Sequence, residues 1–326
     1  MDEQSGRDLC LAFIGAGEWV EKYHLPALRR LSRQQGVSVA GIWNRTRAKA
    51  EKLAADFSLP KVYGDLQEAA DDPAINCFAV AVNSQAVGEI LRTLAARNLP
   101  VICEKPPGRD GDEALQLAQR ITATNVVAFN RRYMPINQQF KELIDRERIE
   151  FVECSFYRRQ RDVERFVTET GIHGINLLEY LFGDIARVET ERWKVAGSST
   201  YNWLASLRFS SGLRGLIKFF PFAGVSLEKV EVNGRDITAS VQTAHPFTDA
   251  REGAINIQKH GANGRADVEV VEQKDLEPLR AGGFEGEYLD LFEAIRKKRE
   301  TVSNFQNAWR SVVVAEAVQQ GAAIQL

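Results

Sequence analysis

The stretch Phe-Ile-Gly-Ala-Gly-Glu-Trp-Val, residues 13–20, decides the fold. It lies between an apolar run and an amphipathic run, so its two glycines join a predicted strand to a predicted helix. Gly15 permits the tight turn, and Gly17 lets a pyrophosphate approach the backbone. The amino terminus of the helix offers unpaired N–H groups to phosphate, and Glu18 and Trp19 directly follow the loop. We therefore expect these four residues to contribute to a dinucleotide-binding site.

The third position of this glycine pattern departs from the usual motif. Val20 stands where a third glycine would let the helix pack closely on the strand. The larger side chain should hold the helix slightly off the strand, while the two phosphate-facing glycines stay intact. On these residues alone, an ordinary turn remains the alternative to a nucleotide site.

Around this stretch, strand-like and helical runs alternate through the first 129 residues. The expected strands are 9–14, 37–43, 75–82, 99–103 and 125–129, and the expected helices are 23–34, 46–57, 84–97 and 111–123. The strands are nearly all apolar, as expected when helices cover both faces of a parallel sheet. Residues 1–129 are therefore predicted to form an α/β dinucleotide-binding domain, with the doubly wound parallel sheet of a Rossmann fold.

After residue 130 the pattern changes to alternation with period two, which is typical of an antiparallel sheet. The signals are hairpin strands at 201–209 and 213–220, a hairpin turn at Asn233-Gly234, and helices at 284–299 and 305–320. Residues 244–283 are polar and glycine-rich and receive no assignment. Residues 130–326 are thus predicted to form an α+β domain built on an open, mostly antiparallel sheet.

The overall composition excludes several classes of protein. The 42 Lys and Arg residues nearly balance 44 Asp and Glu, so a net charge of -2 gives no general attraction for nucleic acid or an anionic membrane. The polar amino terminus does not resemble a secretory signal, and no apolar run is long enough to cross a bilayer. The four cysteines and four histidines lack metal-ligand spacing. We therefore expect a cytoplasmic protein without a metal site.

The end of the second expected strand distinguishes the two nicotinamide cofactors. An acid there would bind the adenosine ribose hydroxyl of NAD, whereas an arginine accommodates the 2′-phosphate of NADP. The chain has Asn44, Arg45 and Thr46 at this place, without a carboxylate. Because the Arg45 guanidinium can pair with phosphate, we expect these residues to contact the cofactor and NADP to be preferred. If Arg45 and Arg47 are only a solvated helix start, NAD remains possible.

A lysine follows the fourth expected strand, in Val-Ile-Cys-Glu-Lys-Pro-Pro, residues 101–107. Ligands of open parallel sheets gather at the carboxyl ends of the strands. Pro106 keeps Lys105 out of a helix, so the ammonium can donate to a substrate oxygen at this edge. Such a donor stabilises an alkoxide during oxidation and polarises a carbonyl during reduction. A lysine without a catalytic role is the alternative.

A second candidate lies in Thr-Glu-Thr-Gly-Ile-His-Gly-Ile-Asn, residues 168–176. If this segment is helical, Glu169 and His173 are i,i+4 neighbours, and Asn176 lies one turn further. Histidine exchanges protons near neutral pH, and a carboxylate one turn away can raise its basicity or hold a substrate hydroxyl. A structural histidine is the alternative, but the upstream Lys105 favours the catalytic interpretation.

A resemblance to a known family rests on five motifs. They are Gly15-Ala-Gly17, His24-Leu-Pro-Ala-Leu28, Glu104-Lys105-Pro106, Arg132-Tyr-Met-Pro135, and Gly171-Ile-His173 followed by Leu-Leu-Glu-Tyr-Leu-Phe-Gly183. On these motifs the chain resembles the family of glucose-fructose oxidoreductase, inositol dehydrogenase and the rhizopine-catabolism oxidoreductases, from residue 9 to the carboxyl terminus. The Glu-Lys-Pro motif and the histidine segment together are quite specific.

The resemblance implies a Rossmann domain followed by an α+β domain whose open sheet often forms the subunit interface, and hence a homodimer or homotetramer. It implies that Lys105 is the catalytic lysine and that His173 is the proton-transferring histidine. It further implies that Asn83, Glu104 and Lys105 lie beside the cofactor, and that Lys105, Arg132, Glu169, His173 and Asn176 lie beside a small-molecule substrate.

Three features of the sequence depart from the family pattern. Many members have an aspartate where this chain has Glu169, which keeps the charge but moves it by about a methylene. Asn176 replaces an aspartate that often follows the histidine. A Thr-Pro-Asn-x-x-His pattern is replaced by Val82-Asn83-Ser-Gln-Ala-Val87, without proline or histidine. These departures bear on which substrate is bound.

The sequence therefore predicts an NADP-dependent oxidoreductase that transfers a hydride between the nicotinamide and a sugar, cyclic polyol or related carbonyl or alcohol. In this hypothesis Lys105 stabilises the oxygen at the reacting carbon, His173 gives or takes its proton, and Glu169 orients the substrate or the histidine. Two alternatives stay open, namely a reductase of an imine or conjugated double bond and a non-catalytic NADP-binding sensor or scaffold. The arginines at 158, 159 and 161 could bind an anionic group of the substrate or form a solvated charge run, and we expect the solvated charge run.

Overall fold

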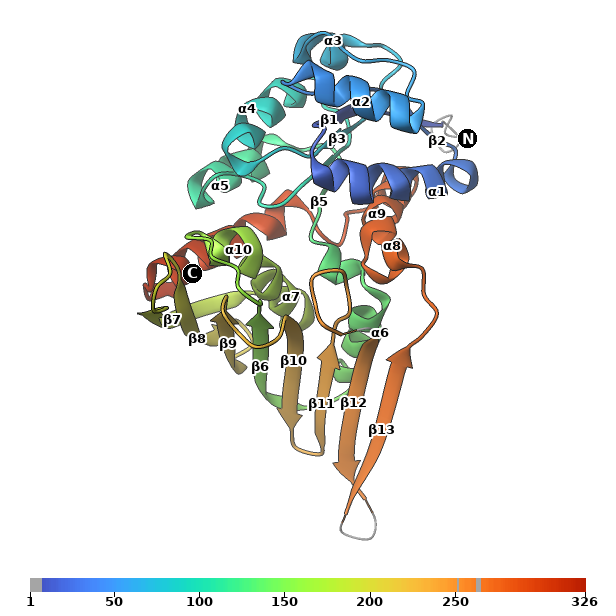
Figure 1. Ribbon diagram of the computed structural model, residues 1–326. Helices are drawn as coiled ribbons and strands as arrows, with labels where there is room; N and C mark the ends of the chain where they lie inside the picture. Colours follow the sequence, from blue (N-terminus) through green and yellow to red (C-terminus); the bar gives the residue numbers. More distant parts are fainter. Residues whose placement is uncertain (1–7, 251, 262–264) are drawn as a thin grey trace. The chain divides into compact units, whose positions relative to one another are not determined.

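The computed structural model describes residues 8–250, 252–261 and 265–326, and the chain divides into two compact units. Unit 1 comprises Met1–Asn130 and Phe284–Trp309, and unit 2 comprises Arg131–Gly283 and Arg310–Leu326. Each unit is built on its own sheet (Figure 1).

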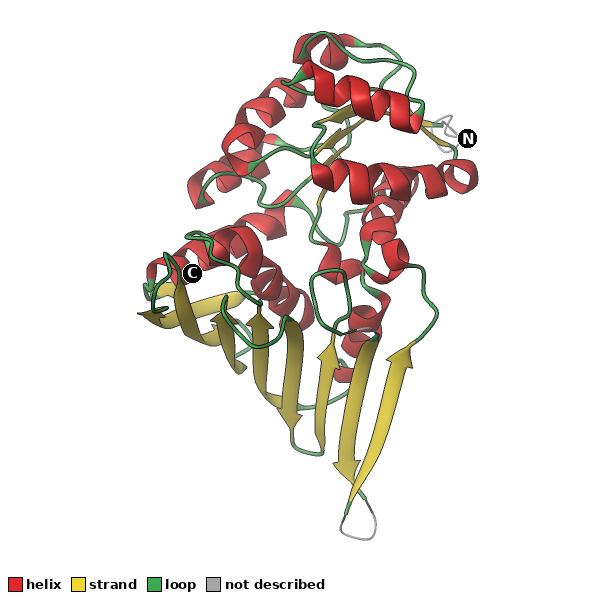
Figure 2. Cartoon of the chain, viewed as in Figure 1, coloured by secondary structure: helices red, strands yellow, loops and turns green. Residues whose placement is uncertain are grey.

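Unit 1 is built on a parallel sheet with helices along both of its faces (Figure 2). Its elements are β1 (Leu9–Ile14), the π-helical turn η1 (Val20–His24), α1 (Leu25–Gln35), β2 (Val37–Trp43), α2 (Arg47–Phe57), α3 (Leu66–Asp71), β3 (Cys77–Val80), α4 (Ser84–Ala95), β4 (Val101–Cys103), α5 (Gly111–Arg120), β5 (Asn125–Val127) and α9 (Phe284–Lys297). Among the described residues the strand order is β2-β1-β3-β4-β5. The expected doubly wound α/β fold is confirmed.

The segment 284–309 packs with unit 1, although the sequence analysis grouped it with residues 130–326. Helix α9 packs on α1 and β5 through its apolar face. The chain that follows α9 runs beside the last strand, where the Val127 N–H donates to the Ser303 carbonyl at 2.8 Å. Thr301 and Ser303 also donate their hydroxyls to carbonyls of β5. Because these bonds satisfy the edge of the sheet, the segment completes unit 1.

Unit 2 is built on a mixed sheet in which only β6 and β9 pair in parallel among the described strands. Its elements are α6 (Pro135–Ile144), β6 (Ile149–Tyr157), the π-helical turn η3 (Val167–Gly171), α7 (Ile172–Phe182), β7 (Ile185–Lys194), β8 (Tyr201–Phe209), β9 (Arg214–Phe220), β10 (Leu227–Gly234), β11 (Ile237–Gln242), β12 (Gly253–His260), β13 (Ala266–Gln273), α8 (Pro278–Ala281) and β14 (Ile324–Gln325). The 3-10 turn η2 (Asn130–Tyr133) and α10 (Phe305–Gln320) each run from one unit into the other. Within the described ranges the strand order is β13-β12-β11-β10-β6-β9-β8-β7-β14, which confirms the open, mostly antiparallel sheet.

The two faces of this sheet differ in burial. Phe156, Trp203 and Phe219 lie on the covered face and are at most 1% exposed. The helices of unit 2 gather on that face (Figure 2). On the opposite face Phe151 and Trp193 remain 38% and 42% exposed. The alternation read from the sequence therefore reflects one covered and one open face.

The turn expected at Asn233-Gly234 lies elsewhere. Both residues belong to β10 and pair with β6. A Cβ on Gly234 would lie 2.5 Å from the Arg148 carbonyl oxygen, so glycine permits a close approach of two strands here. Asn233 also pairs with Thr238 of β11, which moves the turn to residues 235–236. The hairpin is confirmed, but its predicted turn position was wrong.

Three further properties concern the whole described chain. In the described ranges, no helix combines the length and the apolar character needed to cross a membrane. The same residues contain no cluster of three or more His, Cys, Asp or Glu side chains that could hold a metal ion. All four cysteines are unpaired.

Candidate active site

The glycine-rich loop of unit 1 joins β1 to a helix that begins at Glu18. Gly15 has a φ of +118°, and a Cβ there would lie 2.1 Å from the Ala81 carbonyl oxygen, so only glycine fits. A Cβ on Gly17 would meet no atom within 4 Å. The protein itself therefore does not require glycine at residue 17. The open space fits the close approach of a pyrophosphate.

The helix after this loop begins with an unusually wide turn. Val20 is fully buried and starts the π-helical turn η1. Such turns are rare and occur frequently at functional sites. Val20, which occupies the third glycine position, thus lies where the helix after the loop makes its wider turn.

The side chains of Glu18 and Trp19 are engaged within unit 1. Glu18 pairs with Lys22 at 2.5 Å. The Trp19 ring packs edge-on against Tyr23 and Phe284, with centroid distances of 4.6 and 6.4 Å. No side chain caps η1 at Trp19. A phosphate would therefore meet the backbone N–H groups of this turn rather than these two side chains.

The residues after β2 lie beside the loop. Asn44 Oδ1 accepts a hydrogen bond from the Ala16 N–H at 3.1 Å, and Asn44 Nδ2 donates to the Thr46 carbonyl at 3.0 Å. Arg45 and Thr46 are exposed. Within the described part of the chain Arg45 makes no ion pair, whereas Arg47 pairs with Glu51 at 2.7 Å. The structure thus brings Asn44 to the loop and leaves the Arg45 guanidinium exposed to solvent.

Lys105 lies in the turn after β4, at the same carboxyl edge of the sheet as the loop. Its own backbone N–H donates to Glu104 Oε2 at 3.1 Å, and Glu104 is 8% exposed. The Glu104 N–H continues the sheet by donating to the Val80 carbonyl of β3 at 2.8 Å. Lys105 itself is half-buried, and its peptide bond to Pro106 is cis. Since only β3 separates β1 from β4, this turn lies one strand away from the glycine-rich loop.

Asn83 follows β3 at this same edge and begins α4. Its Oδ1 accepts the Ala86 N–H at 3.1 Å, so the side chain caps the helix. Val87, at the position of the family's histidine, is buried and 1% exposed. The side-chain oxygen of Asn83 is thus used by the protein itself.

In unit 2 the second candidate segment is helical, but it does not begin as a regular α-helix. Residues 167–171 form η3, and α7 begins only at Ile172. Glu169 lies in this π-helical turn and His173 in the first turn of α7, so the two residues remain about one helical turn apart. His173 is buried at 6% exposure, whereas Glu169 is exposed.

A buried polar chain in unit 2 includes two residues of α7, Asn176 and Glu179. Arg132 Nε donates to Asn176 Oδ1 at 2.7 Å, and Asn176 Nδ2 donates to Ser311 Oγ at 2.9 Å. The Ser311 hydroxyl in turn donates to Glu179. Burial raises the pKa of Glu179 to about 7, with Ser311 and Arg132 opposing the shift. The structure thus brings Arg132 and Asn176 together and adds a buried carboxyl that the sequence analysis did not identify.

The expectation for the arginines after β6 was wrong at one position. Arg158 is 5% exposed and donates to buried Glu228, which Arg131 also contacts at 2.8 Å. His245 Nε2 lies 2.9 Å from the same carboxylate. Burial alone would raise the pKa of Glu228, but the charges around it hold that pKa well below its usual range. Arg158 is therefore part of the core, while Arg159 is exposed as expected.

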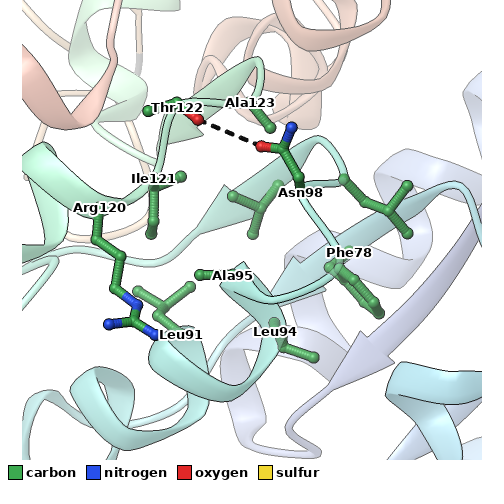
Figure 3. Close-up of a pocket in the computed structure, with 11 residues that line it drawn as sticks. Phe78, Leu91, Leu94, Ala95, Asn98, Arg120, Ile121, Thr122 and Ala123 are labelled. Atoms are coloured by element: carbon green, nitrogen blue, oxygen red, sulfur yellow. Dashed lines mark hydrogen bonds between the residues drawn. The ribbon is translucent and has the colours of Figure 1, made fainter.

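Unit 1 also contains a small cavity, shown in Figure 3. It is lined by Phe78, Leu91 and Leu94 among others and has a volume of about 10 Å³, room for roughly one water molecule. Phe78 and Val101 of its lining lie at the amino ends of β3 and β4. The cavity therefore lies at the opposite edge of the sheet from the loop and Lys105.

Comparison with known proteins supports these features. The family model described as an oxidoreductase family with an NAD-binding Rossmann fold matches residues 9–131. The model of the C-terminal α/β domain of the same family matches residues 158–324. The expected resemblance is thereby confirmed.

Individual relatives are more distant. An uncharacterized protein of Saccharomyces cerevisiae is 23% identical over 336 aligned residues, covering 90% of this chain and 89% of that protein. The inositol 2-dehydrogenase of Mycolicibacterium smegmatis is 32% identical over 143 residues, which span 42% of this chain and only 40% of the enzyme. The structure of levoglucosan dehydrogenase in complex with NADH and levoglucosan superposes with a TM-score of 0.83 at 17% identity, covering 98% of this chain and 99% of that one. This likeness shows the same fold.

The two family models together cover most of the chain, and the loop, the strand order and the second sheet agree with them. The chain belongs to the glucose-fructose oxidoreductase, inositol dehydrogenase and rhizopine-catabolism family of oxidoreductases, with an NAD-binding Rossmann domain followed by an α/β domain.

Proposed function

We propose that this oxidoreductase uses NADP and moves a hydride to or from a carbon of a sugar, cyclic polyol or related carbonyl compound. The position of Lys105 carries the proposal. Lys105 follows β4 at the same edge of the sheet at which Gly15 and Gly17 follow β1. Ligands of open parallel sheets bind at this edge. An ammonium beside a nicotinamide site suits an oxygen that gains negative charge.

The preference for NADP rests on Arg45. Its guanidinium is exposed and lies next to Asn44, which holds the glycine-rich loop. A guanidinium can bind a phosphate through two parallel hydrogen bonds, and such charge-assisted bonds are strong. The levoglucosan dehydrogenase structure contains NADH, so the proposed preference for NADP rests on the residues that follow β2 in this chain.

The proposed roles follow from the chemistry of alcohol oxidation. Bound nicotinamide would accept the hydride from the substrate carbon, or supply it in the reverse direction. Lys105 donates an N–H to the oxygen on that carbon and stabilises its negative charge. His173 accepts the hydroxyl proton in oxidation and returns it in reduction.

The remaining residues are assigned to binding. Exposed Glu169 accepts a hydrogen bond from a substrate hydroxyl or orients His173. Arg132 and Asn176 are held together by their 2.7 Å hydrogen bond and shape the substrate side in unit 2. The names of the inositol and levoglucosan dehydrogenases support a ring with several hydroxyls as the substrate class.

A second copy of the chain is the proposed partner, bound through the open face of the nine-stranded sheet. Trp193, Phe220 and Tyr157 form an aromatic cluster on that face, with ring centroids 6.0 and 5.0 Å apart. Exposed aromatic residues are enriched at interfaces. A Trp193→Glu variant should be monomeric in analytical ultracentrifugation if this face forms the dimer or tetramer, and an unchanged oligomer would rule the face out.

We also infer a cytoplasmic location, which suits four unpaired cysteines.

The decisive experiment replaces Lys105 with alanine. Turnover would be followed by nicotinamide absorbance with myo-inositol and levoglucosan as probes, and NADPH affinity by fluorescence titration. We expect kcat/KM to fall by about 100-fold or more, with NADPH affinity nearly unchanged. Unchanged turnover would overturn the assignment of Lys105. Tight NADPH binding without turnover of any hydroxylated probe would favour the non-catalytic alternative.

A further inference from the structure

Three buried side chains of unit 1 form a hydrogen-bonded chain that ends at Lys105. His24 is the last residue of η1, Glu104 follows β4, and Tyr288 lies in α9. Their exposed fractions are 2%, 8% and 0%. His24 Nε2 lies 3.0 Å from Glu104 Oε1, and His24 Nδ1 lies 2.9 Å from the Tyr288 hydroxyl oxygen. One buried histidine thus connects three segments that are far apart in the sequence.

One assignment of donors and acceptors satisfies all three side chains. Burial holds the pKa of Tyr288 well above its usual range, so the phenol stays protonated and donates to His24 Nδ1. In this assignment His24 Nδ1 accepts and His24 Nε2 carries a proton that it donates to Glu104 Oε1. The other carboxylate oxygen, Oε2, accepts the Lys105 N–H. Both oxygens of Glu104 therefore have a donor.

Glu104 connects this chain to the main chain of Lys105. A buried carboxylate with a donor on each oxygen has a fixed orientation. Because one of these donors is the Lys105 backbone N–H, the orientation of Glu104 determines where the turn lies. Without His24, the carboxylate would lose a donor in the core and would have to move or admit water.

The location of His24 suggests a role beyond stability. A buried polar network is a weak source of stability compared with apolar packing of the same volume. The ring centroids of Phe13 and His24 are 5.9 Å apart, so an apolar aromatic side chain in place of His24 could also pack here. His24 ends the wide turn that follows the glycine-rich loop, so it joins the nucleotide helix to the Lys105 turn.

We propose that His24 is a positioning residue for Lys105. His24 acts through Glu104, and it couples the helix that follows the glycine-rich loop to the turn that carries the Lys105 ammonium. The proposal rests on the proposed function, in which Lys105 acts on the substrate oxygen. It predicts that the environment of the Lys105 amine depends on His24, whether or not the natural substrate is known.

The test compares His24→Phe with a matched control. Tyr63→Phe removes another hydrogen bond of unit 1, the partly buried bond from the Tyr63 hydroxyl to Asp72 at 3.2 Å, far from Lys105 in the strand order. The first readout is competitive acylation of lysines by acetic anhydride as a function of pH, quantified by mass spectrometry, with exposed Lys194 of unit 2 as the internal reference. The second is kcat and KM with myo-inositol and NADP⁺.

We expect His24→Phe to shift the acylation profile of Lys105 but not that of Lys194, and to lower kcat by about tenfold or more with NADPH affinity unchanged. His24→Gln, whose amide can donate to Glu104, should recover most of both. Should His24→Phe not fold, Glu104→Gln serves as the second variant and should give the same shift. If the acylation profile of Lys105 in His24→Phe, or in Glu104→Gln, is the same as in Tyr63→Phe, the proposal is overturned.

The two proposals fail in different ways. If Lys105→Ala leaves turnover unchanged, the catalytic assignment of Lys105 is wrong, and the acylation profile still decides whether His24 positions the turn. If Lys105→Ala abolishes turnover while His24→Phe behaves like Tyr63→Phe, the proposed function stands and the positioning role of His24 is wrong.

Discussion

Asn44, at the carboxyl end of β2, accepts a 3.1 Å hydrogen bond from the backbone N–H of Ala16 inside the glycine-rich loop. The same amide donates to the Thr46 carbonyl at 3.0 Å. One side chain therefore holds the loop and the residues that follow β2 in a common arrangement. Arg45 lies between Asn44 and Thr46 in the sequence, and its side chain is exposed. Two neighbouring residues thus have separable effects on the cofactor.

Arg45→Ala should weaken NADPH binding by about 10- to 100-fold, the range expected when a charge-assisted hydrogen bond worth roughly 1.5–3 kcal/mol is lost. NADH affinity should change little, because NADH lacks the 2′-phosphate. Titration of intrinsic fluorescence with both cofactors measures the effect. Arg47→Ala is the matched control, since Arg47 is paired with Glu51. Equal affinity for both cofactors, indifferent to Arg45, would contradict the NADP assignment.

Asn44→Ala should weaken both cofactors by a similar factor, on the order of tenfold, because it removes a hydrogen bond that shapes the loop rather than a contact with one phosphate. The ratio of NADPH to NADH affinity should therefore stay close to that of the wild type. The same titration tests this. A change confined to NADPH would mean that Asn44, like Arg45, discriminates between the cofactors.

The two loop glycines should respond differently to alanine. Gly15→Ala places a Cβ 2.1 Å from the Ala81 carbonyl oxygen at a φ of +118°, so we expect a loss of unfolding free energy of more than about 2 kcal/mol. Gly17→Ala meets no atom within 4 Å, so its stability should be unchanged while cofactor affinity falls. Thermal unfolding without cofactor, followed by titration, separates the two effects. Normal NADPH affinity in Gly17→Ala would show that the open space does not receive the pyrophosphate.

Much of unit 1 was predictable because its signals are local. The apolar strands and the glycine-rich loop can each be recognised from a few consecutive residues. The expected bounds of β1 and β2 agree with the structure. Helix α3 was not expected, although Asp65 caps it by accepting the Glu68 N–H at 2.7 Å. The helix has only six residues, too few to show an amphipathic period.

The rest depends on contacts between distant residues. His24 is 80 positions from Glu104 and 264 from Tyr288, so no local pattern reveals that chain. Arg158 looked like a surface charge because its partner Glu228 lies 70 residues away. The wide turn η3 likewise has no propensity signal, so a start of the regular helix α7 only at Ile172 was not expected.

Glu179 provides a prediction about pH that no local pattern suggested. Its Oε2 accepts the Ser311 hydroxyl, and its buried Oε1 has no hydrogen-bond partner among the described residues. Burial raises its pKa from 4.5 to about 7. Because the folded state holds this proton more tightly than the unfolded state, the associated stability is complete below pH 4.5 and is lost as the pH rises through about 7.

Glu179→Gln should therefore be more stable than the wild type at pH 8, by about 3 kcal/mol at most, since each unit of pKa shift corresponds to about 1.4 kcal/mol. At pH 5 the difference should nearly vanish, because the folded wild type is then protonated. Chemical denaturation across this pH range measures the difference, and Glu142→Gln on the exposed surface of α6 is the control. A pH-independent difference would mean that the Glu179 carboxyl does not titrate in this window. Since Ser311 and Asn176 connect Glu179 to Arg132, we also expect its ionisation to affect turnover more than NADPH binding.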